Sequence, residues 1–305
     1  MIDRYGKVAV LMGGWSAERE VSLMSGAQVL SALQQSGVDA HAIDVDRDVI
    51  ARLQAEGFDR VFNVLHGRGG EDGEIQGALQ LAGIAYTGSG IMASSLAMDK
   101  LKSKEVCHAR GILTPQWRVV ESYEACRAAA EAFGFPIVVK PVSEGSSIGV
   151  YIVRESADLA KAWEAAALHG QVLAEQFIAG MEVTAAVLEG EALPLVSMST
   201  DRDFYDYEAK YFDDDTVYRC PCGLAEELEQ EIRAVALTVF NALNVTGWGR
   251  VDFMLDADHH AHFIEINTIP GMTTHSLVPM AAAQAGIDFN ALCLRILDSS
   301  LGVNK

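Results

Sequence analysis

The sequence of residues 249–267 is GRVDFMLDADHHAHFIEIN. Apolar and polar side chains alternate on both sides of the polar break DADHH, which predicts two strands joined in a hairpin. A turn centred in that break pairs Asp252 with Glu265. The same register pairs Arg250 with Asn267. Directly paired residues share one face of a sheet, so these four side chains are expected together. The opposite face is expected to supply apolar side chains to the core: Val251, Phe253, Leu255, Ile264 and Ile266.

The two paired carboxylates predict a metal site. Asp252 and Glu265 would repel each other unless positive charge lay between them. With the amide oxygen of Asn267 they form an all-oxygen ligand set, which suits Mg²⁺ or Mn²⁺ rather than zinc. Magnesium in proteins usually also holds substrate phosphates. The alternative is a solvated hairpin face with a salt bridge from Arg250, so the metal hypothesis needs a phosphate site elsewhere in the chain.

Length and charge exclude several classes of protein. The 305 residues, 50% of them hydrophobic, are enough for two or three domains with cores of their own. A net charge of -19 and a pI of about 4.7 argue against nucleic acid or an anionic membrane as a partner. The N-terminal residues do not resemble a signal peptide, and no apolar run is long enough to span a membrane. The five cysteines, an odd number and widely spaced except for Cys220 and Cys222, predict free thiols and a cytoplasmic location.

The first third of the chain predicts a parallel sheet. Strands alternate with helices, an order that places helices on the faces of a parallel sheet and ligands at the carboxyl ends of its strands. No G-x-G-x-x-G follows the first strand, and no G-x-x-x-x-G-K-[ST] occurs, which argues against a nicotinamide cofactor and a P-loop. The expected strands are 7–12, 38–44, 60–65 and 84–87, and the expected helices are 16–33, 49–56 and 71–81.

The middle of the chain supplies a candidate phosphate site. One long helix is expected at 92–109. Further along, a strand that ends near Lys140 precedes the Gly/Ser-rich segment 142–149 and another short strand. Backbone N–H groups of such a loop can close over phosphates, and Lys140 can meet one as a point charge. An ordinary hairpin loop is the alternative. The aromatic and acidic segment 204–222 has neither period and predicts a lid.

Seven segments, in this order, resemble the ATP-grasp ligases, and among them the D-alanine–D-alanine ligase family. Each motif is weak alone, but together they span nearly the whole chain. They are GGWSAEREVS at 13–22, HGRGGEDG at 66–73, MDK at 98–100, VKP through EGSSIG at 139–149, YEAKY at 207–211, GRVD at 249–252 and EIN through PGMTTHSL at 265–277.

The resemblance implies an α/β (α+β) fold of the ATP-grasp type. An N-terminal, Rossmann-like parallel-sheet domain (pre-ATP-grasp, residues 1–98) would bind the first amino acid. Two α+β domains, residues 99–179 and 180–305, would enclose ATP. The implied activity is the ATP-dependent joining of two D-alanines through a D-alanyl phosphate, for peptidoglycan precursor synthesis. Two Mg²⁺ (or Mn²⁺) ions and a homodimer formed through the first domain are also implied.

The resemblance also assigns roles to single residues. Glu18 would meet the ammonium of the first D-alanine, with Ser146 and Tyr211 linked to it by hydrogen bonds. Arg250 and the N–H of Gly271 would stabilise the oxyanion of the tetrahedral intermediate. The other implied contacts are His66 near the first substrate, Ser276 and the N–H of Leu277 at the second carboxylate, Lys100, Lys140 and Lys210 at phosphates, Glu175, Gln176, Phe177 and Glu182 around adenine and ribose, and Asp252, Glu265 and Asn267 at the metals.

Several alternatives remain open at this point. Glu18 could serve only the helix dipole, Glu182 could be an edge-strand carboxylate, and His66 could make a purely structural bond. The acceptor could be D-lactate or another amino acid, but the family's D-lactate ligases carry Phe where this chain has Tyr211. A nucleotide-binding regulator without catalysis would lack residues such as Arg250, and none is missing.

Overall fold

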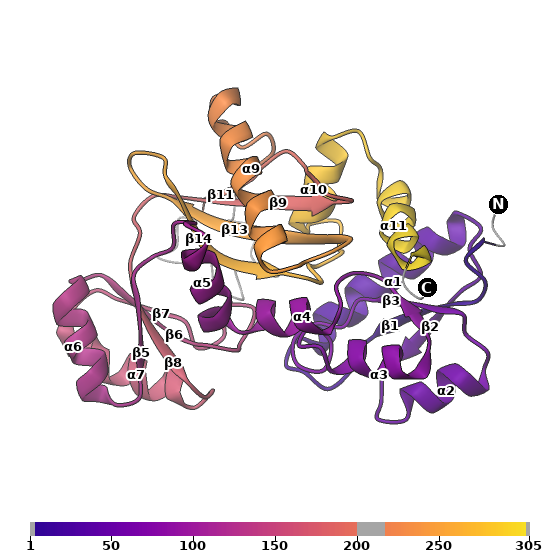
Figure 1. The fold of residues 1–305 in the computed structure, drawn as a ribbon, viewed down its shortest axis with the longest axis horizontal. Helices are drawn as coiled ribbons and strands as arrows, with labels where there is room; N and C mark the ends of the chain where they lie inside the picture. The colour runs from indigo at the N-terminus through magenta and orange to yellow at the C-terminus, as the bar shows by residue number, and fades with distance from the viewer. Residues whose placement is uncertain (1–3, 200–216, 303–305) are drawn as a thin grey trace.

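In the computed structural model, which describes residues 4–199 and 217–302, the strands form three sheets that follow one another along the chain (Figure 1). The predicted mixed α/β class with a parallel N-terminal sheet is confirmed. The division into domains 1–98, 99–179 and 180–305 stays a prediction.

The first sheet is parallel, with the strand order β2-β1-β3-β4. The central strand β1 is buried along its whole length because both of its faces are covered. Val8 and Val10 face a core that contains α1, whereas Ala9 and Leu11 face the core under α2 and α3. The elements are β1 (Val8–Met12), α1 (Arg19–Gln35), β2 (Ala40–Asp44), α2 (Val49–Ala55), β3 (Arg60–Asn63), α3 (Glu74–Ala82) and β4 (Ala85–Tyr86).

The second sheet is antiparallel, with the order β5-β8-β6-β7. Its helices α6 and α7 pack on one face and enclose a core of small and aliphatic side chains. The predicted hairpin around the Gly/Ser-rich segment is confirmed, because β6 and β7 pair on either side of it. The elements are β5 (Trp117–Val120), α6 (Tyr123–Phe133), β6 (Ile137–Pro141), β7 (Tyr151–Val153), the short 3-10 helix Ser156–Asp158, α7 (Leu159–Ala167) and β8 (Val172–Gln176).

The third sheet has the order β12-β11-β9-β13-β14, and β10 pairs with β9 outside that path. Helix α9 packs on one of its faces, while α10 and α11 follow the last strand. The elements are β9 (Met181–Leu188), β10 (Glu191–Ala192), β11 (Val196–Ser199), β12 (Val217–Arg219), α9 (Glu226–Ala242), β13 (Trp248–Leu255), β14 (Ala261–Asn267), α10 (Leu277–Gln284), α11 (Phe289–Asp298) and the 3-10 helix Ser299–Leu301.

The predicted register of the β13–β14 hairpin is confirmed near its open end and wrong near its turn. Asp252 pairs with Glu265 as expected, but the register then shifts by one residue and Phe253 pairs with Phe263. This β-bulge turns the Phe263 side chain into the core, where it is fully buried. Ile264, which was expected in the core, instead lines a cavity beside Glu265.

The predicted long helix 92–109 is wrong in one respect: the structure has two helices, α4 (Ile91–Met98) and α5 (Lys100–Ala109). Asp99 interrupts them with an extended backbone, and its side chain accepts a hydrogen bond from the N–H of Lys102 at 2.9 Å. The N–H of Lys100 is thereby freed to donate to the carbonyl of Val142 at 3.0 Å. The break therefore starts α5 at Lys100, next to the segment that follows β6.

The first and third sheets share one hydrophobic core. Side chains of β1 and α1 belong to the same cluster as Trp248 of β13 and the apolar faces of α10 and α11. The second sheet has its own core, and α5 stands between it and the third sheet (Figure 1). A small cluster of Leu101, Val142 and Leu173 joins α5 to the second sheet.

All five cysteines are free. Among residues 4–199 and 217–302, no single helix has the length and apolarity to cross a membrane; one bent pair, Leu277–Gln284 with Phe289–Leu301, meets the criteria of length and composition only when its two parts are taken together.

We expect Asp99→Ala to lower the free energy of unfolding by about 1 kcal/mol, because α5 loses its N-terminal cap. Asp99→Asn should retain most of the stability, since an amide oxygen can accept the same hydrogen bond. Urea denaturation followed by circular dichroism measures the difference. Equal unfolding free energies for wild type and Asp99→Ala would contradict the capping role.

Candidate active site

Two cavities meet at the hairpin carboxylates. The first, of about 550 Å³, lies between the second and third sheets and is lined by Lys140 and Glu175 on one side and Met254 on the other. The second, of about 620 Å³, is lined by residues from strands and loops of all three sheets. Among them are Glu18, His66, Arg250, Asn267, Gly271 and Ser276. Asp252, Glu265 and Glu182 line both. A group held at these carboxylates can therefore reach both cavities.

Asp252 is held by four hydrogen bonds from three neighbours. Arg250 donates from Nε and from Nη2 of its guanidinium group, each at 2.8 Å, and the side-chain amide of Asn267 donates at 3.0 Å. Thr184 of β9 donates from Oγ1 at 2.5 Å. The salt bridge of the alternative hypothesis is thus present, but the face is not solvated, because Asp252 is only 5% exposed. Thr184 was not predicted, since the pairing of β9 with β13 that brings it to Asp252 leaves no local signal in sequence.

Glu265 is paired with Lys100 from the first turn of α5. The ammonium lies 3.1 Å from Oε2 of Glu265 and donates to the carbonyl of Glu144 at 2.5 Å. Burial opposes the charged form of Lys100, but Glu265, together with Glu175 and Glu18, outweighs it and raises the pKa of the lysine above its ordinary value. Lys100 is therefore a buried group that is charged at neutral pH, at the junction of the two cavities.

Glu175 and two lysines form a buried cluster at the far wall of the first cavity. Lys140 lies 2.9 Å from Oε2 of Glu175, and Lys104 of α5 lies 3.3 Å from Oε1. Burial opposes ionisation of the carboxyl, but the two ammonium groups outweigh it and hold the pKa of Glu175 below its usual value. Lys140 and Glu175 were predicted site residues, but Lys104 was not, because its burial depends on how α5 packs. Gln176 and Phe177 continue the same wall, and Glu182 faces them from β9.

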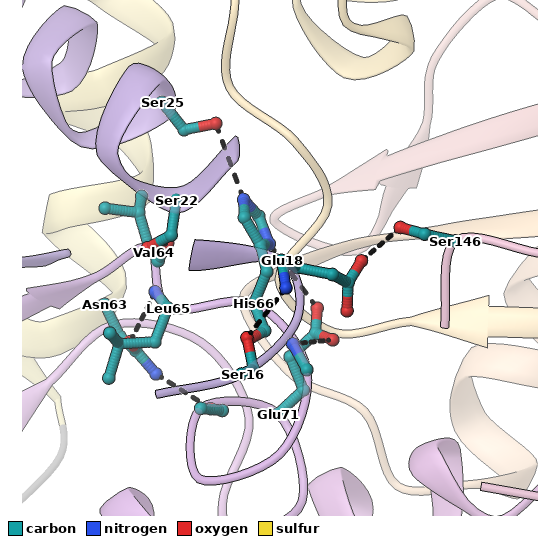
Figure 2. Close-up of polar contacts among 12 residues, drawn as sticks. Ser16, Glu18, Ser22, Ser25, Asn63, Val64, Leu65, His66, Glu71 and Ser146 are labelled. Atoms are coloured by element: carbon teal, nitrogen blue, oxygen red, sulfur yellow. Dashed lines mark hydrogen bonds and ion pairs between the residues drawn. The ribbon is translucent and has the colours of Figure 1, made fainter. Parts of the chain in front are cut away.

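Glu18 lies just before α1 and makes no capping hydrogen bond with its side chain. Figure 2 shows its carboxylate pointing toward Ser146, whose hydroxyl donates to Oε1. Burial, followed by repulsion from Glu71, raises the pKa of Glu18 above its ordinary value. A cationic ligand at this carboxylate would relieve both effects. Glu18 and Ser146 thus bring the first sheet's loops and the Gly/Ser-rich loop into contact.

His66 is buried beside Glu18 and contacts two side chains (Figure 2). Nδ1 lies 3.7 Å from Oε1 of Glu71, and Nε2 lies 3.4 Å from the hydroxyl of Ser25. Burial disfavours the imidazolium, but the hydrogen bond and charge of Glu71 outweigh it and raise the pKa of His66. Ser25 also accepts the N–H of Met272 at 3.2 Å, so α1 is tied to the loop that contains Gly271. Ser25 was another residue that the sequence did not reveal.

The loop before α10 brings backbone N–H groups to the second cavity. Ser276 precedes the first helical residue, Leu277, and accepts the N–H of Thr273 at 3.0 Å. A Cβ atom at Gly271 would lie 2.9 Å from Oγ of Ser276, so this position leaves little room for a side chain. The unpaired N–H groups at a helix start favour an anion. Gly271, Ser276 and Leu277 all line the second cavity.

The predicted metal ligands fit a hard divalent cation. The carboxylates of Asp252 and Glu265 are directly paired across β13 and β14, and Asn267 lies beside Asp252 on the same face. Oxygen ligands of this kind suit Mg²⁺ or Mn²⁺. Arg250 and Lys100 provide the positive charge that keeps the Asp252 and Glu265 carboxylates from repelling each other when no metal is bound. Of the predicted site residues, Lys210 and Tyr211 lie outside the described residues.

Comparison with known proteins identifies relatives along the whole chain. The family models described as D-ala D-ala ligase N-terminus and C-terminus match residues 7–51 and 49–89, and residues 106–298. A D-alanine–D-alanine ligase of Stutzerimonas stutzeri is 55% identical over 298 residues, which cover 97% of this chain and 95% of the relative.

Solved structures of two ligases are also similar. A Bacillus anthracis D-alanine–D-alanine ligase complexed with ATP has a TM-score of 0.85 and 32% identity, with 97% of this chain and 98% of that one covered. The VanG D-Ala:D-Ser ligase of Enterococcus faecalis has a TM-score of 0.82 and 29% identity, with 96% and 99% covered.

We expect His66 to titrate above 6.5, the ordinary value for imidazole, and Glu71→Gln to lower its pKa. Because the pKa is raised in the folded protein, the charged imidazole stabilises the fold below pH 6.5, and this contribution is lost as the pH rises through the folded pKa. The difference in the free energy of unfolding between wild type and Glu71→Gln should therefore become smaller as the pH rises from 6.5 through the pKa of His66 in the folded protein. NMR of the imidazole protons, assigned with His66→Gln, measures the pKa, and an unchanged value in Glu71→Gln would refute the account.

Proposed function

This chain belongs to the D-alanine–D-alanine ligase family, and we propose that it uses ATP to join two molecules of D-alanine into D-alanyl-D-alanine for peptidoglycan precursor synthesis. The observation that supports this most directly is the junction of two cavities at Asp252 and Glu265. A ligase that activates a carboxylate with ATP must hold the γ-phosphate and the carboxylate side by side. One cavity of nucleotide size that opens onto another at a pair of carboxylates meets this need.

We assign the first cavity to ATP. Lys100 and Lys140, with Lys210, would contact phosphates, and the wall formed by Glu175, Gln176 and Phe177 would receive adenine. Glu182, at the edge shared with the second cavity, would contact ribose. The buried cations matter because the chain carries a net charge of -19, a field that opposes binding of a polyanion unless local positive charge overcomes it.

We assign Asp252, Glu265 and Asn267 to two Mg²⁺ ions (or Mn²⁺). Bound there, the ions would neutralise charge on the β- and γ-phosphates during transfer. Arg250 and Lys100 already lie against the two carboxylates, so they would orient these side chains before the substrates arrive. Thr184, which is paired with Asp252 on the neighbouring strand β9, would also hold this carboxylate in place.

The second cavity would hold both D-alanines. Glu18, buried and held by Ser146, would bind the ammonium of the first and so leave its carboxylate directed at the γ-phosphate. Ser276 and the N–H of Leu277 would bind the carboxylate of the second. Transfer of the phosphoryl group yields D-alanyl phosphate and ADP. The amine of the second D-alanine then attacks the acyl carbon, and phosphate leaves from the tetrahedral intermediate.

Arg250 and the N–H of Gly271 would stabilise the oxyanion of that intermediate. Both line the second cavity, and Arg250 is anchored by two hydrogen bonds to Asp252. Fixed donors aimed at a developing negative charge contribute strongly in a site that excludes water. Acyl phosphates hydrolyse readily, so closure of loop 145–149 over the site would protect the intermediate. Segment 205–218 is also expected to close over the site, but its residues 205–216 lie outside the described residues, and Val217 and Tyr218 belong to β12.

We further propose that the chain is divided into domains 1–98, 99–179 and 180–305, that it acts in the cytoplasm, and that it forms a homodimer through its first domain. The one specific observation that favours another acceptor is the similarity to a D-Ala:D-Ser ligase. Tyr211 supports D-alanine over D-lactate, on the resemblance described above.

The experiment that tests the function is ADP release with single acceptors. Purified protein with ATP, Mg²⁺ and D-alanine should release ADP and form the dipeptide, whereas L-alanine should not support turnover. D-lactate and D-serine, offered together with D-alanine, should yield little mixed product. Chelation of Mg²⁺ should stop turnover and its return should restore it. The absence of ADP release with D-alanine would overturn the proposal.

Arg250→Ala should lower kcat by about 10²–10³-fold, the usual cost of losing an oxyanion donor. Arg250→Lys should rescue only part of the loss, because an ammonium cannot reproduce two parallel hydrogen bonds to Asp252. Steady-state kinetics measures the effect, and circular dichroism checks the fold. Arg295→Ala is the matched control, since Arg295 lies on α11, is partly exposed and, within the described part of the chain, is bonded to Glu189 alone. Full turnover in Arg250→Ala would refute the oxyanion role.

A further inference from the structure

Lys104 is a fully buried lysine for which the assignments above provide no role. It lies on α5, its side chain has no exposed surface, and its ammonium is 3.3 Å from Oε1 of Glu175 and 3.5 Å from the carbonyl of Phe263. Lysine is almost never buried completely unless it is paired, because desolvating the charge is costly. Lys102, two residues earlier, is exposed and pairs with Glu105. The burial of Lys104 is therefore a specific feature of its position.

The two lysines at Glu175 differ in their access to ligand. Lys140 lines the first cavity, whereas Lys104 lies behind Glu175 and does not line it. A nucleotide phosphate would compete with Glu175 for the ammonium of Lys140. Among the described residues, Lys104 contacts the Glu175 carboxylate and the carbonyl of Phe263, and it does not line the cavity in which a phosphate would compete for it. Burial lowers the pKa of Lys104 to about 8, with Glu175 opposing that shift, so the lysine is mostly charged at neutral pH.

Helix α5 supplies two lysines to carboxylates that line the first cavity. Lys100 and Lys104 lie one turn apart and therefore on the same face of the helix. Lys100 pairs with Glu265, at the junction of the two cavities, and Lys104 pairs with Glu175. One helix is thus paired with two carboxylates of the space assigned to ATP.

We propose that Lys104 is a positioning residue that fixes the Glu175 carboxylate, ionised, to accept a hydrogen bond from the exocyclic amino group of adenine. Lys104 thereby determines selectivity for the nucleotide base without touching the nucleotide. This inference rests on the proposed assignment of Glu175 to the adenine end of the first cavity. A carboxylate accepts hydrogen bonds only, so it favours the 6-amino group of adenine over a purine that lacks this group.

Equilibrium binding of two nucleotides to the full chain tests the inference. The probes are ATP and purine riboside triphosphate, which lacks the 6-amino group, measured by calorimetry with Mg²⁺ and without D-alanine. The quantity compared is the dissociation constant of purine riboside triphosphate divided by that of ATP. We expect this ratio to exceed one in wild type, because ATP binds more tightly. Lys104→Met should lower the ratio about tenfold, the size expected for a hydrogen bond to a charged group. A general loss of protein stability would weaken the binding of both nucleotides alike and leave the ratio unchanged. Lys102→Met, on the same helix, is the control and should leave the ratio as in wild type.

A variant of Glu175 separates this inference from the function on which it rests. An unchanged ratio in Glu175→Met, which has no oxygen acceptor, would remove the assignment of Glu175, and the role of Lys104 with it, while leaving the ligase activity to be judged by ADP release. A ratio lowered in Glu175→Met but not in Lys104→Met would overturn the role of Lys104 alone. If Lys104→Met does not fold, the double variant Lys104→Met/Glu175→Met removes both buried charges together. Its ratio should equal that of Glu175→Met, and a further fall would show that Lys104 does not act through Glu175.

Discussion

The carboxylates of Asp252 and Glu265 face the same side of the β13–β14 hairpin in directly paired positions, where they repel each other. Arg250 on the same strand balances the first, and Lys100 on α5 balances the second. The pairing of Lys100 with Glu265 depends on the break at Asp99. This break starts α5 at Lys100 and lets the N–H of Lys100 bond to the loop after β6. The junction of the two cavities is therefore built from the β13–β14 hairpin, α5 and the loop after β6.

The same principle extends through the first cavity. Three lysines are buried among residues 4–199 and 217–302 of this strongly acidic protein, and each is matched to a carboxylate: Lys100 to Glu265, and Lys104 and Lys140 to Glu175. Buried pairs of this kind contribute little to stability, because desolvation offsets the attraction, but removing one partner is costly. Their value here is in geometry: charged groups are held in fixed positions before a polyanionic nucleotide arrives.

Much of this site could be predicted because its parts are local in sequence. Asp252, Glu265 and Asn267 lie on one hairpin, whose alternation gave the correct register at the site, and the break at Asp99 had a signal in the aspartate that caps α5. What escaped prediction depends on tertiary packing. The bulge that exchanges Phe263 and Ile264 is set by the core beneath it. Three other contacts, those of Thr184, Lys104 and Ser25, join residues far apart in the chain, and no periodicity encodes them.

The distribution of the cores bears on how the site can close. The first and third sheets share one extensive core, so Glu18 and His66 are tied firmly to the strands that carry Arg250 and Asp252. The second sheet has its own core and reaches the others through α5, the small cluster around Leu101, and contacts such as that of Ser146 with Glu18. Units joined by limited apolar contact are expected to move relative to each other. We therefore expect the wall that carries Lys140 and Glu175 to be the part that adjusts relative to the first and third sheets. Because Lys104 belongs to α5 but pairs with that wall, the adjustment would be guided by the same helix that holds Glu265.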